Sequence, residues 1–231
     1  MANKERPALL QELEAKLNCS FVSKKLLDQA LTHSSYILQN KHLQHYERLE
    51  FFGDAVLKLV VSEHLYHRFP DLNEGELTKI RAVIVSDALL ATIGLQLDLG
   101  KYLLLGPNEK RTGGKKRNSN MANSLEAIIG ANYIDSGLES ARKLILHLFE
   151  TDIKRVSEMD EIYDYKSALQ ELVQQQHLEL PSYTVAKERG AEHQKIFSVI
   201  ASIRQGSNKV DGQGEGKTKK EAEQKAAQEI L

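Results

Sequence analysis

Apolar side chains recur every three or four positions along most of the first 156 residues, which is the spacing of a helix face turned toward a core. Leu10, Leu13 and Leu17, for example, share one face of an amphipathic helix. No alternation of apolar and polar residues, the pattern of a half-buried strand, interrupts this part of the chain. The pattern predicts helices over residues 7–17, 24–31, 46–69, 74–84, 87–97, 118–135 and 138–153, with loop-like sequence over 106–120. We therefore expect an all-α first domain over residues 1–156.

The pattern changes after a short polar segment, residues 157–161, which we interpret as a linker. Beyond it, alternating segments typical of strands appear between two segments of helical spacing. The predicted elements are a helix over 165–177, strands over 182–189, 195–203 and, more weakly, 208–211, then a glycine-rich loop over 212–216 and a final helix. The order helix, three strands, helix predicts an α+β domain over residues 162–231.

Three carboxylates stand at helical spacing within residues 45–57. Glu47, Glu50 and Asp54 occupy positions i, i+3 and i+7, so they share one face of the predicted helix. Like charges at this spacing destabilise an isolated helix by roughly 0.2–0.5 kcal/mol per pair. A divalent cation with oxygen ligands would offset this repulsion. A solvated acidic face is the simpler alternative.

The apolar residues around these acids favour a binding site over a solvated face. The stripe expected to face the core consists of Leu49, Phe52, Val56, Leu59 and Val60. Phe51, Leu57 and Val61 are expected to share or border the acidic face, where they would be unfavourable against water alone. We therefore expect a partner chain or a substrate to cover this surface.

A second predicted helix adds further candidates. Asn123 and Glu126 are i, i+3 neighbours, so their side chains share a face that could converge with the acids of the first helix. Oxygen ligands of this kind suit Mg²⁺ or Mn²⁺ better than zinc. The preceding segment, residues 111–117, places four cationic side chains around two glycines. Such a segment next to acids could contact phosphates, although a basic loop is often only solvated.

Composition limits the function classes without choosing one. The 231-residue chain is 41% hydrophobic and 27% charged, as globular proteins are. Its formal net charge is −1, so any basic surface for nucleic acid must be local. Cys19 is the single cysteine, which excludes an intrachain disulfide framework, and we interpret it as a half-buried apolar residue. The sequence shows no signal-peptide core and no membrane-spanning run, so we expect a soluble cytoplasmic protein.

The stretch from Glu47 to Leu57, ERLEFFGDAVL, resembles the signature sequence of the ribonuclease III family. Tyr46 and Phe52 stand where Asn and Leu are common in that family. The resemblance implies an endoribonuclease that cleaves double-stranded RNA, including precursors of ribosomal RNA and other structured RNAs, by two-metal-ion phosphodiester hydrolysis. The products would have 5′-phosphate and 3′-hydroxyl ends with short 3′ overhangs.

The same resemblance implies roles for individual residues. The metal-binding oxygens would come from Glu50, Asp54, Asn123 and Glu126, with Mg²⁺ as the cofactor and Mn²⁺ as a substitute. Glu47 and Glu74 would be outer catalytic acids, although for Glu74 a first-turn acid favoured by the helix dipole explains the residue nearly as well. Phe51 would pack into the partner of a homodimer. No membrane and no small-molecule cofactor would be involved.

The string GKTKKEAE over residues 216–223 resembles double-stranded-RNA-binding domains. Its lysines gather at a helix N-terminus, where free N–H groups and the helix dipole already favour phosphate. Two glutamines share a polar face of the domain's first helix, and one histidine lies in the loop between strands. Together these elements would span ~16 base pairs of duplex RNA. The residues expected to contact RNA are Gln170, Gln174, His193, Lys217, Lys219 and Lys220.

Asn123 departs from the family pattern, which places aspartate there in Asp-x-x-Glu. An amide oxygen can bind a metal, but it brings no negative charge. Three explanations stay open: a natural variant with slower or Mn²⁺-biased activity, a natural RNA binder that has lost cleavage, or an engineered inactive form. The alternative function is therefore a catalytically weakened or inactive dimer that binds double-stranded RNA. A helical phosphohydrolase of nucleotides is a third hypothesis, which leaves the C-terminal domain without a role.

Overall fold

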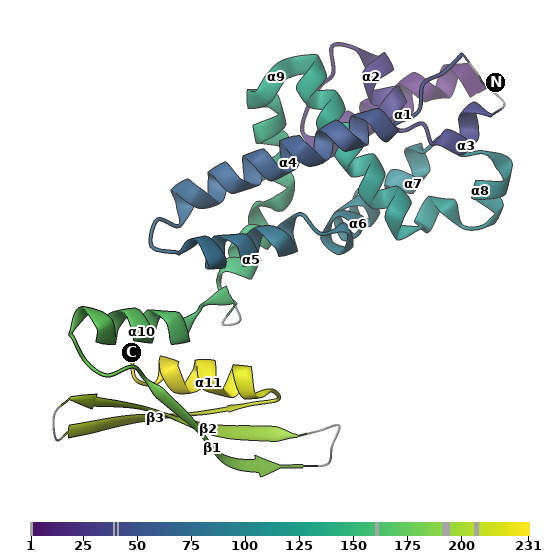
Figure 1. Ribbon diagram of the computed structural model, residues 1–231. Helices are drawn as coiled ribbons and strands as arrows, with labels where there is room; N and C mark the ends of the chain where they lie inside the picture. The colour runs from purple at the N-terminus through teal and green to yellow at the C-terminus, as the bar shows by residue number, and fades with distance from the viewer. Residues whose placement is uncertain (1, 39, 41, 160–161, 191–194, 206–207) are drawn as a thin grey trace. The chain divides into compact units, whose positions relative to one another are not determined.

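The computed structural model describes every residue except 1, 39, 41, 160–161, 191–194 and 206–207 (Figure 1). The chain divides into two compact units, Met1–Glu158 and Met159–Leu231. The described part of the first unit is built from helices, and that of the second from helices and a three-stranded sheet. This arrangement confirms the predicted fold class.

The first unit follows the predicted helical pattern closely. Its helices are α1 (Ala2–Leu17), α2 (Lys24–Ala30), α3 (Ser34–Ile37), α4 (Glu47–Arg68), α5 (Glu74–Ile84), α6 (Asp87–Gln96), α7 (Leu99–Tyr102), α8 (Pro107–Arg111), η1 (Gly114–Lys116) and α9 (Asn118–Ser157). The loop predicted over 106–120 was wrong in part, because α8, η1 and the start of α9 lie there. Helices of three to five residues are too short to show a hydrophobic period.

The centre of the first unit is the pair α4 and α9, which lie against each other (Figure 1). α5 packs on α4 as well as on α9, so α4 is covered on more than one side, while α6 packs on α9. The buried arc of α4 is therefore wider than the single stripe expected from sequence. Leu57 and Val61, expected beside the acids, are fully buried. Leu59, expected in the core, is 54% exposed.

Capping residues set the starts of α5 and α6, the two helices that flank α9. The Asn73 side chain accepts a hydrogen bond from the Glu76 amide, and the Glu76 carboxylate accepts one from the Asn73 amide, at 3.0 and 2.9 Å. The Ser86 hydroxyl accepts from the amide of Leu89 at 3.3 Å. These contacts satisfy amides that a helix start leaves unpaired. They fix where the first turn of each helix lies.

The second unit is an antiparallel sheet in the order β1-β2-β3, with helices α10 and α11 on one face (Figure 1). Its elements are α10 (Tyr165–Gln175), β1 (Ser182–Arg189), β2 (Ile196–Gln205), β3 (Asn208–Gly216) and α11 (Lys219–Gln228). The core between sheet and helices contains Val199 and Ala201 of β2 with Ala222 and Ala226 of α11. Small alanines let α11 lie close to the sheet.

The glycine-rich segment predicted as a loop is part of β3, so that prediction was wrong. A β-carbon on Gly212 would lie 2.4 Å from the carbonyl oxygen of Ala226, and one on Gly214 would lie 2.2 Å from that of Ala222. The glycines therefore serve the close approach of α11 to the strand rather than a turn. The sequence shows the glycines and predicts the final helix, but only the fold shows that this helix packs over them.

The surface combines one half-buried thiol with several exposed apolar side chains. None of the described helices is both long and apolar enough to span a membrane. Cys19 is half-buried, and burial raises the pKa of its thiol to about 11, so the thiol stays protonated.

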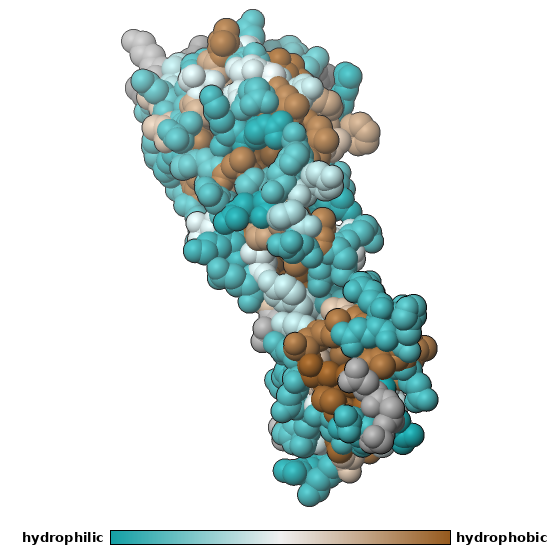
Figure 2. All heavy atoms as spheres, turned by 90° about the vertical axis from the view of Figure 1, so that its left-hand side faces the viewer, coloured by the Kyte–Doolittle hydropathy of each residue, from teal (hydrophilic) through white to brown (hydrophobic). Residues whose placement is uncertain are grey.

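Apolar surface remains on the second unit, where Figure 2 shows a brown area. The exposed large apolar residues of that unit include Leu172, Leu180, Val185, Ile196 and Val210.

Candidate active site

The candidate site is built on an unusually close crossing of α4 and α9. A β-carbon on Gly53 would lie 1.9 Å from the carbonyl oxygen of Glu126. One on Gly130 would lie 2.3 Å from the carbonyl oxygen of Leu49. Because no side chain separates the two backbones here, residues one turn away on each helix come within reach of each other. Those residues include the acids of α4 and the Asn123 and Glu126 pair of α9.

Glu50 and Asn123 meet across this crossing. Their side chains are hydrogen-bonded, and since a carboxylate only accepts, the Asn123 amide donates. Burial is the main cause that raises the pKa of Glu50, and the charge of Glu47 adds to it. The hydrogen bond from Asn123 opposes both effects. An aspartate at position 123 would have no proton to donate and would repel Glu50 instead.

Glu126 is the most buried acid of the site. Its side chain is 9% exposed, and among the described residues none forms a hydrogen bond or ion pair with its carboxylate. Burial is the main cause that raises the pKa of Glu126 to about 7. The negative charges of Asp54, Glu50 and Asp87 raise its pKa further. Glu126 therefore lies in electrostatic range of the α4 acids and lacks a compensating partner.

Asp54 forms an ion pair with a lysine of its own helix. Lys58 Nζ lies 2.7 Å from Asp54 Oδ2, one helical turn along α4. The lysine side chain is 53% exposed, so water screens this pair strongly. Lys58 lowers the pKa of Glu126 less than the surrounding acids raise it. The site keeps an excess of negative charge, which favours a bound cation.

The donor set fits a hard divalent cation, but the side chains are not yet arranged as ligands. Among the described residues, no three His, Cys, Asp or Glu side chains converge closely enough to form a ready-made metal site. Glu50 is engaged by Asn123, and Asp54 by Lys58. Both would exchange these partners for the cation. The unpartnered, buried Glu126 carboxylate and the all-oxygen donors are what Mg²⁺ or Mn²⁺ would require.

The two outer acids lie in different places. Glu47 stands in the first turn of α4, 3.7 Å from His45, and its charge acts on Glu50. Glu74 begins α5 and accepts a hydrogen bond from Thr78 at 3.0 Å. It lines a cavity of about 420 Å³ together with Ser62, which lies more than three helical turns beyond Glu50. Three turns measure about 16 Å, so the part of α4 beside this cavity is well separated from Glu50.

Asp87 is an acid that the sequence pattern did not connect with the site. It stands in the first turn of α6, and its charge acts on both Glu50 and Glu126. No spacing rule relates Asp87 to residues so far away in the chain on α4 or α9, so no sequence signal marked it. Only the packing of α6 on α9 brings it to the site.

Apolar side chains on α4 form a separate surface beside the acids. Phe51 is 80% exposed, Leu59 54% and Tyr66 69%, and their spacing places them on one face. A cavity of about 700 Å³ lies next to Phe51. Its lining includes Leu26, Phe52 and the 53% exposed Ile134. An exposed phenylalanine beside an apolar hollow is a surface that a partner chain could cover.

The second unit carries the residues expected to contact RNA, and those described are exposed. They are Gln170 and Gln174 on α10 and Lys217, Lys219 and Lys220 at the start of α11. Thr218 caps α11, and its hydroxyl accepts from the Glu221 amide at 3.1 Å. Lys219 Nζ lies 3.4 Å from Glu188 and 5.5 Å from the Phe197 ring centroid. His193 lies outside the described residues.

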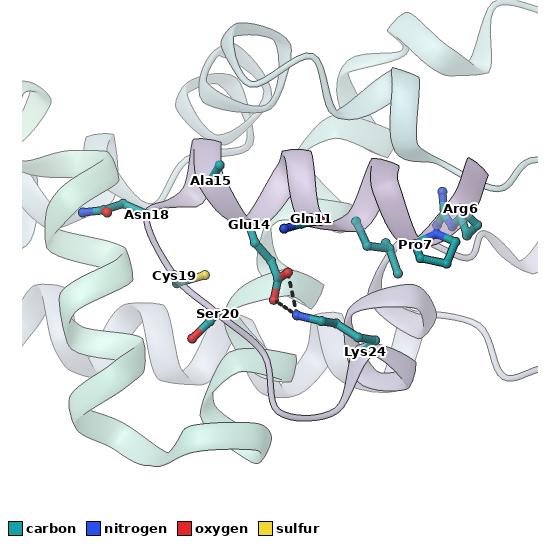
Figure 3. Close-up of a pocket in the computed structure, with 10 residues that line it drawn as sticks. Arg6, Pro7, Gln11, Glu14, Ala15, Asn18, Cys19, Ser20 and Lys24 are labelled. Atoms are coloured by element: carbon teal, nitrogen blue, oxygen red, sulfur yellow. Dashed lines mark hydrogen bonds and ion pairs between the residues drawn. The ribbon is translucent and has the colours of Figure 1, made fainter. Parts of the chain in front are cut away.

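A cavity of about 920 Å³ lies elsewhere on the first unit, between α1 and the segment that follows it (Figure 3). Figure 3 shows Glu14 and Lys24 pointing toward one another, and the two form an ion pair. Glu14 also accepts a hydrogen bond from the Phe21 amide. The ion pair and the hydrogen bond give Glu14 and Lys24 a structural role in holding α1 to the segment that follows it. None of the acids at the α4–α9 crossing lines this cavity.

Comparisons with known proteins match the two units separately and the chain as a whole. Residues 23–153 match the family model described as Ribonuclease-III-like, and residues 165–231 match the double-stranded RNA binding motif. A Ribonuclease 3 from Natranaerobius thermophilus is 48% identical over 94% of this chain and 92% of its own length. A Ribonuclease 3 from Clostridium acetobutylicum is 44% identical over 98% and 97%.

A solved structure supports the same comparison. The nuclease domain of ribonuclease III from Campylobacter jejuni has a TM-score of 0.58 and 43% sequence identity. The similarity covers 62% of this chain and 96% of that one. That structure is described as flexible in a region involved in dimer formation.

Proposed function

Because this chain belongs to the ribonuclease III family and is an endoribonuclease that acts on double-stranded RNA, we propose that it cleaves its substrate by two-metal-ion hydrolysis of phosphodiester bonds. Its substrates are precursors of ribosomal RNA and other structured RNAs in the cytoplasm. The products carry 5′-phosphate and 3′-hydroxyl ends with short 3′ overhangs.

The observation behind this proposal is the unpartnered Glu126 carboxylate among other acids. Glu126 is 9% exposed, and its pKa is raised to about 7. A buried acid of this kind is costly to the fold unless a cation joins it. Glu50, Asp54 and Glu126 hold the cations, with the Asn123 amide oxygen as a neutral ligand. Bound Mg²⁺ or Mn²⁺ supplies an activated water, a stabilised leaving oxygen and neutralised phosphate charge.

The remaining acids orient water and substrate rather than hold the cation directly. Glu47 is within electrostatic range of Glu50 and serves as an outer acid of the same copy. Glu74, at the start of α5, lines a cavity beside a part of α4 that is remote from Glu50, so we do not assign it this role in its own copy. It reaches the site of a second copy if the two α4 helices pair in opposite directions. Glu74 of the partner subunit then completes the acid set.

Pairing through α4 is supported by the exposed apolar face of that helix. A two-fold pair places the same residues of both copies at the interface. Phe51 of each copy then enters the hollow lined by Leu26, Phe52 and Ile134 of the other. This packing covers Phe51 and Ile134, whose side chains are 80% and 53% exposed in a single copy. We infer a homodimer on this ground.

The second unit binds duplex RNA by contacting the phosphate backbone and the minor groove of the RNA. Lys217, Lys219 and Lys220 contact phosphates next to the N-terminus of α11. Gln170 and Gln174 reach 2′-hydroxyls and base edges from α10. His193, which lies outside the described residues, is proposed for the same contact on its sequence position alone. The footprint is ~16 base pairs and depends little on sequence.

The second candidate function, a weakened or inactive dimer that binds double-stranded RNA, is favoured by one contact. The Asn123 amide donates to Glu50 and so holds this side chain without any cation. An aspartate there would need the cation to offset its repulsion with Glu50. With asparagine at position 123, the site therefore depends less on a bound cation for its stability than it would with aspartate. Retention of Glu47, Glu50, Asp54, Glu74 and Glu126 favours the nuclease.

Cleavage of a perfectly paired RNA duplex in Mg²⁺ or Mn²⁺ tests the two functions. We expect measurable cleavage by the chain as it stands and faster cleavage by the Asn123→Asp variant, because a charged ligand holds the cation better. Glu126→Gln should abolish cleavage while duplex binding persists. If Asn123→Asp cuts no faster, the assignment of position 123 to the metal site is wrong. If neither form cuts but both bind RNA, the chain is the binding dimer.

A further inference from the structure

Glu74 stands at one end of a hydrogen-bonded chain of side chains that runs along α5. Glu74, Thr78 and Arg81 are spaced i, i+4 and i+7, so they share one face of this helix. The Thr78 hydroxyl donates to Glu74 Oε1 at 3.0 Å, and Arg81 Nη2 donates to Thr78 Oγ1 at 3.4 Å. The other arm of the guanidinium, Nη1, donates to Ser62 Oγ at 3.1 Å. Because Ser62 belongs to α4, the chain joins Glu74 to a second helix.

Donor chemistry fixes the direction of this chain. A guanidinium has no acceptor atom, so each hydroxyl that it contacts must accept from it and keeps its own proton to donate. The Ser62 hydroxyl donates to the carbonyl oxygen of Lys58 at 2.6 Å, and the Thr78 hydroxyl donates to Glu74. Hydrogen bonds linked in this way polarise one another. One branch of the chain therefore ends on the Glu74 carboxylate.

Thr78 uses its hydroxyl differently from other helical threonines of this protein. A threonine in a helix can donate to the backbone carbonyl one turn earlier. Thr92 of α6 does so toward Ala88 at 2.8 Å, and Thr112 at the end of α8 makes the same kind of bond at 3.2 Å. The Thr78 hydroxyl instead holds the side chain of Glu74, which is exposed. This hydroxyl therefore orients a carboxylate and not only the helix.

Orientation matters for an exposed acid that has to serve a site. A glutamate side chain loses rotamer freedom when it is fixed in one geometry, and a side chain that is already held loses less. α5 packs on α4, and the side chains of this chain line one cavity of about 420 Å³ between the two helices. Arg81 thereby fixes the direction of Glu74 relative to α4, the helix at the proposed dimer interface.

We propose that Thr78 and Arg81 are positioning residues for Glu74. Arg81 holds the Thr78 hydroxyl, and Thr78 holds the Glu74 carboxylate in the orientation in which it serves the acid site of the other copy. Both act through Glu74 and contact neither the RNA nor the cations. This inference rests on the proposed function, because Glu74 takes part in cleavage only within the proposed dimer.

The test is a double-mutant cycle on cleavage of a perfectly paired RNA duplex by the full-length chain. Thr78→Val removes the hydroxyl and should lower kcat about tenfold, as loss of an outer partner of a site does, with duplex affinity unchanged. Thr78→Ser keeps the hydroxyl and should restore most of the rate. Thr92→Val removes a hydroxyl that bonds only a backbone carbonyl of α6, so this control should cleave like the unchanged chain.

The second half of the cycle removes the carboxylate. Arg81→Lys keeps the charge but loses the planar fork that donates to two hydroxyls at once, so by itself it should also slow cleavage. In a Glu74→Ala background, neither Thr78→Val nor Arg81→Lys should slow cleavage further, because no carboxylate is left to orient. A purely structural role would lower the rate by the same factor in both backgrounds.

The outcomes separate this inference from the proposed function. If Glu74→Ala slows cleavage and Thr78→Val does not, or if Thr78→Val acts equally in both backgrounds, the positioning role is wrong and the role of Glu74 stands. If Glu74→Ala leaves cleavage unchanged while Glu126→Gln abolishes it, the outer-acid role of Glu74 is wrong and the inference fails with it. If the unchanged chain does not cleave duplex RNA, the proposed function itself fails.

Discussion

Gly53 of α4 and Gly130 of α9 are in backbone contact, since a β-carbon on Gly130 would lie 3.0 Å from the amide nitrogen of Gly53 and 3.2 Å from its α-carbon. Packed helices are ordinarily separated by side chains, with axes about 8–10 Å apart. Removing the side chains from both helices at one level allows a closer crossing. The acids on either side of that level are brought together as a result.

Gly53→Ala should therefore damage both stability and activity. The added β-carbon would lie 1.9 Å from the Glu126 carbonyl oxygen, which neither backbone can avoid without moving. We expect a decrease of about 1–3 kcal/mol in the free energy of unfolding, measured in urea, as for overpacked cores. Cleavage should fall further than the folded fraction does. Gly75→Ala, in the exposed first turn of α5, is the control; its β-carbon would meet only the Asn73 side-chain oxygen, at 3.3 Å, so it should change stability much less.

Stability without divalent cations should depend on pH through Glu126. Its folded-state pKa is about 7, against an ordinary value of 4.5. Between these values the folded chain keeps a proton that the unfolded chain releases, so the free energy of unfolding falls as pH rises and levels off above about 7. Urea titrations across this range should show the fall, and Glu126→Gln should reduce it, leaving the part that comes from Glu50, whose pKa is also raised. Mg²⁺ should reduce the fall, because the cation favours the charged carboxylate. A pH profile unchanged by Glu126→Gln would contradict the assigned burial.

Phe51→Ala should weaken the proposed dimer. Burial of a phenylalanine side chain stabilises by about 2 kcal/mol, and a two-fold interface contains this contribution twice. The dissociation constant of the dimer should rise about 10³-fold, as measured by analytical ultracentrifugation. Val22→Ala removes another exposed apolar side chain, 89% exposed and outside α4, and should leave dimerisation unchanged. Equal dissociation constants for Phe51→Ala and the original chain would exclude pairing through this face.

Double alanine replacement of Lys217 and Lys220 should weaken duplex binding at all sequences alike. Removing one lysine–phosphate interaction should reduce the slope of log affinity against log salt by about 1. The control replaces Lys209 and Lys225, which already lie 2.8 and 2.9 Å from carboxylates. These paired lysines release few counterions, so the salt slope should stay nearly constant. An unchanged slope for the Lys217 and Lys220 pair would show that they do not touch phosphate.

Asn132→Val should raise the stability of the first unit. Asn132 is 0% exposed, and neither atom of its amide has a hydrogen-bond partner among the described residues. A buried amide left unpaired costs about 1–3 kcal/mol, and an apolar side chain of similar size avoids that cost. Asn120 is the control, because its amide donates to Glu109 and Gly114 at 2.9 and 3.0 Å. Asn120→Val should therefore destabilise. A lower melting temperature for Asn132→Val would indicate that an internal water satisfies the amide.

Sequence-based prediction was most accurate for features that depend on a single helix or strand. Helical spacing gave the longer helices of the first unit but not the short α3, α7, α8 and η1, and alternation gave β1 over the residues that the structure assigns to it. Prediction was less accurate for burial and strand assignments that depend on packing against a second element. Leu57 and Val61 are buried because α5 and α9 cover α4 from more than one side. Gly212 and Gly214 lie in a strand because α11 leaves no room there for a β-carbon.

The candidate site divides in the same way. The spacing of Glu47, Glu50 and Asp54 was visible in the sequence because a helix fixes which of its own residues share a face. The burial of Glu126, the hydrogen bond between Asn123 and Glu50, and the approach of Asp87 were not visible. Each depends on a distance between helices that lie far apart in the chain. The sequence by itself determined the family, the helices and the acids they present. Only the packing of α4 and α6 on α9 decided which acids face one another and which one lacks a partner.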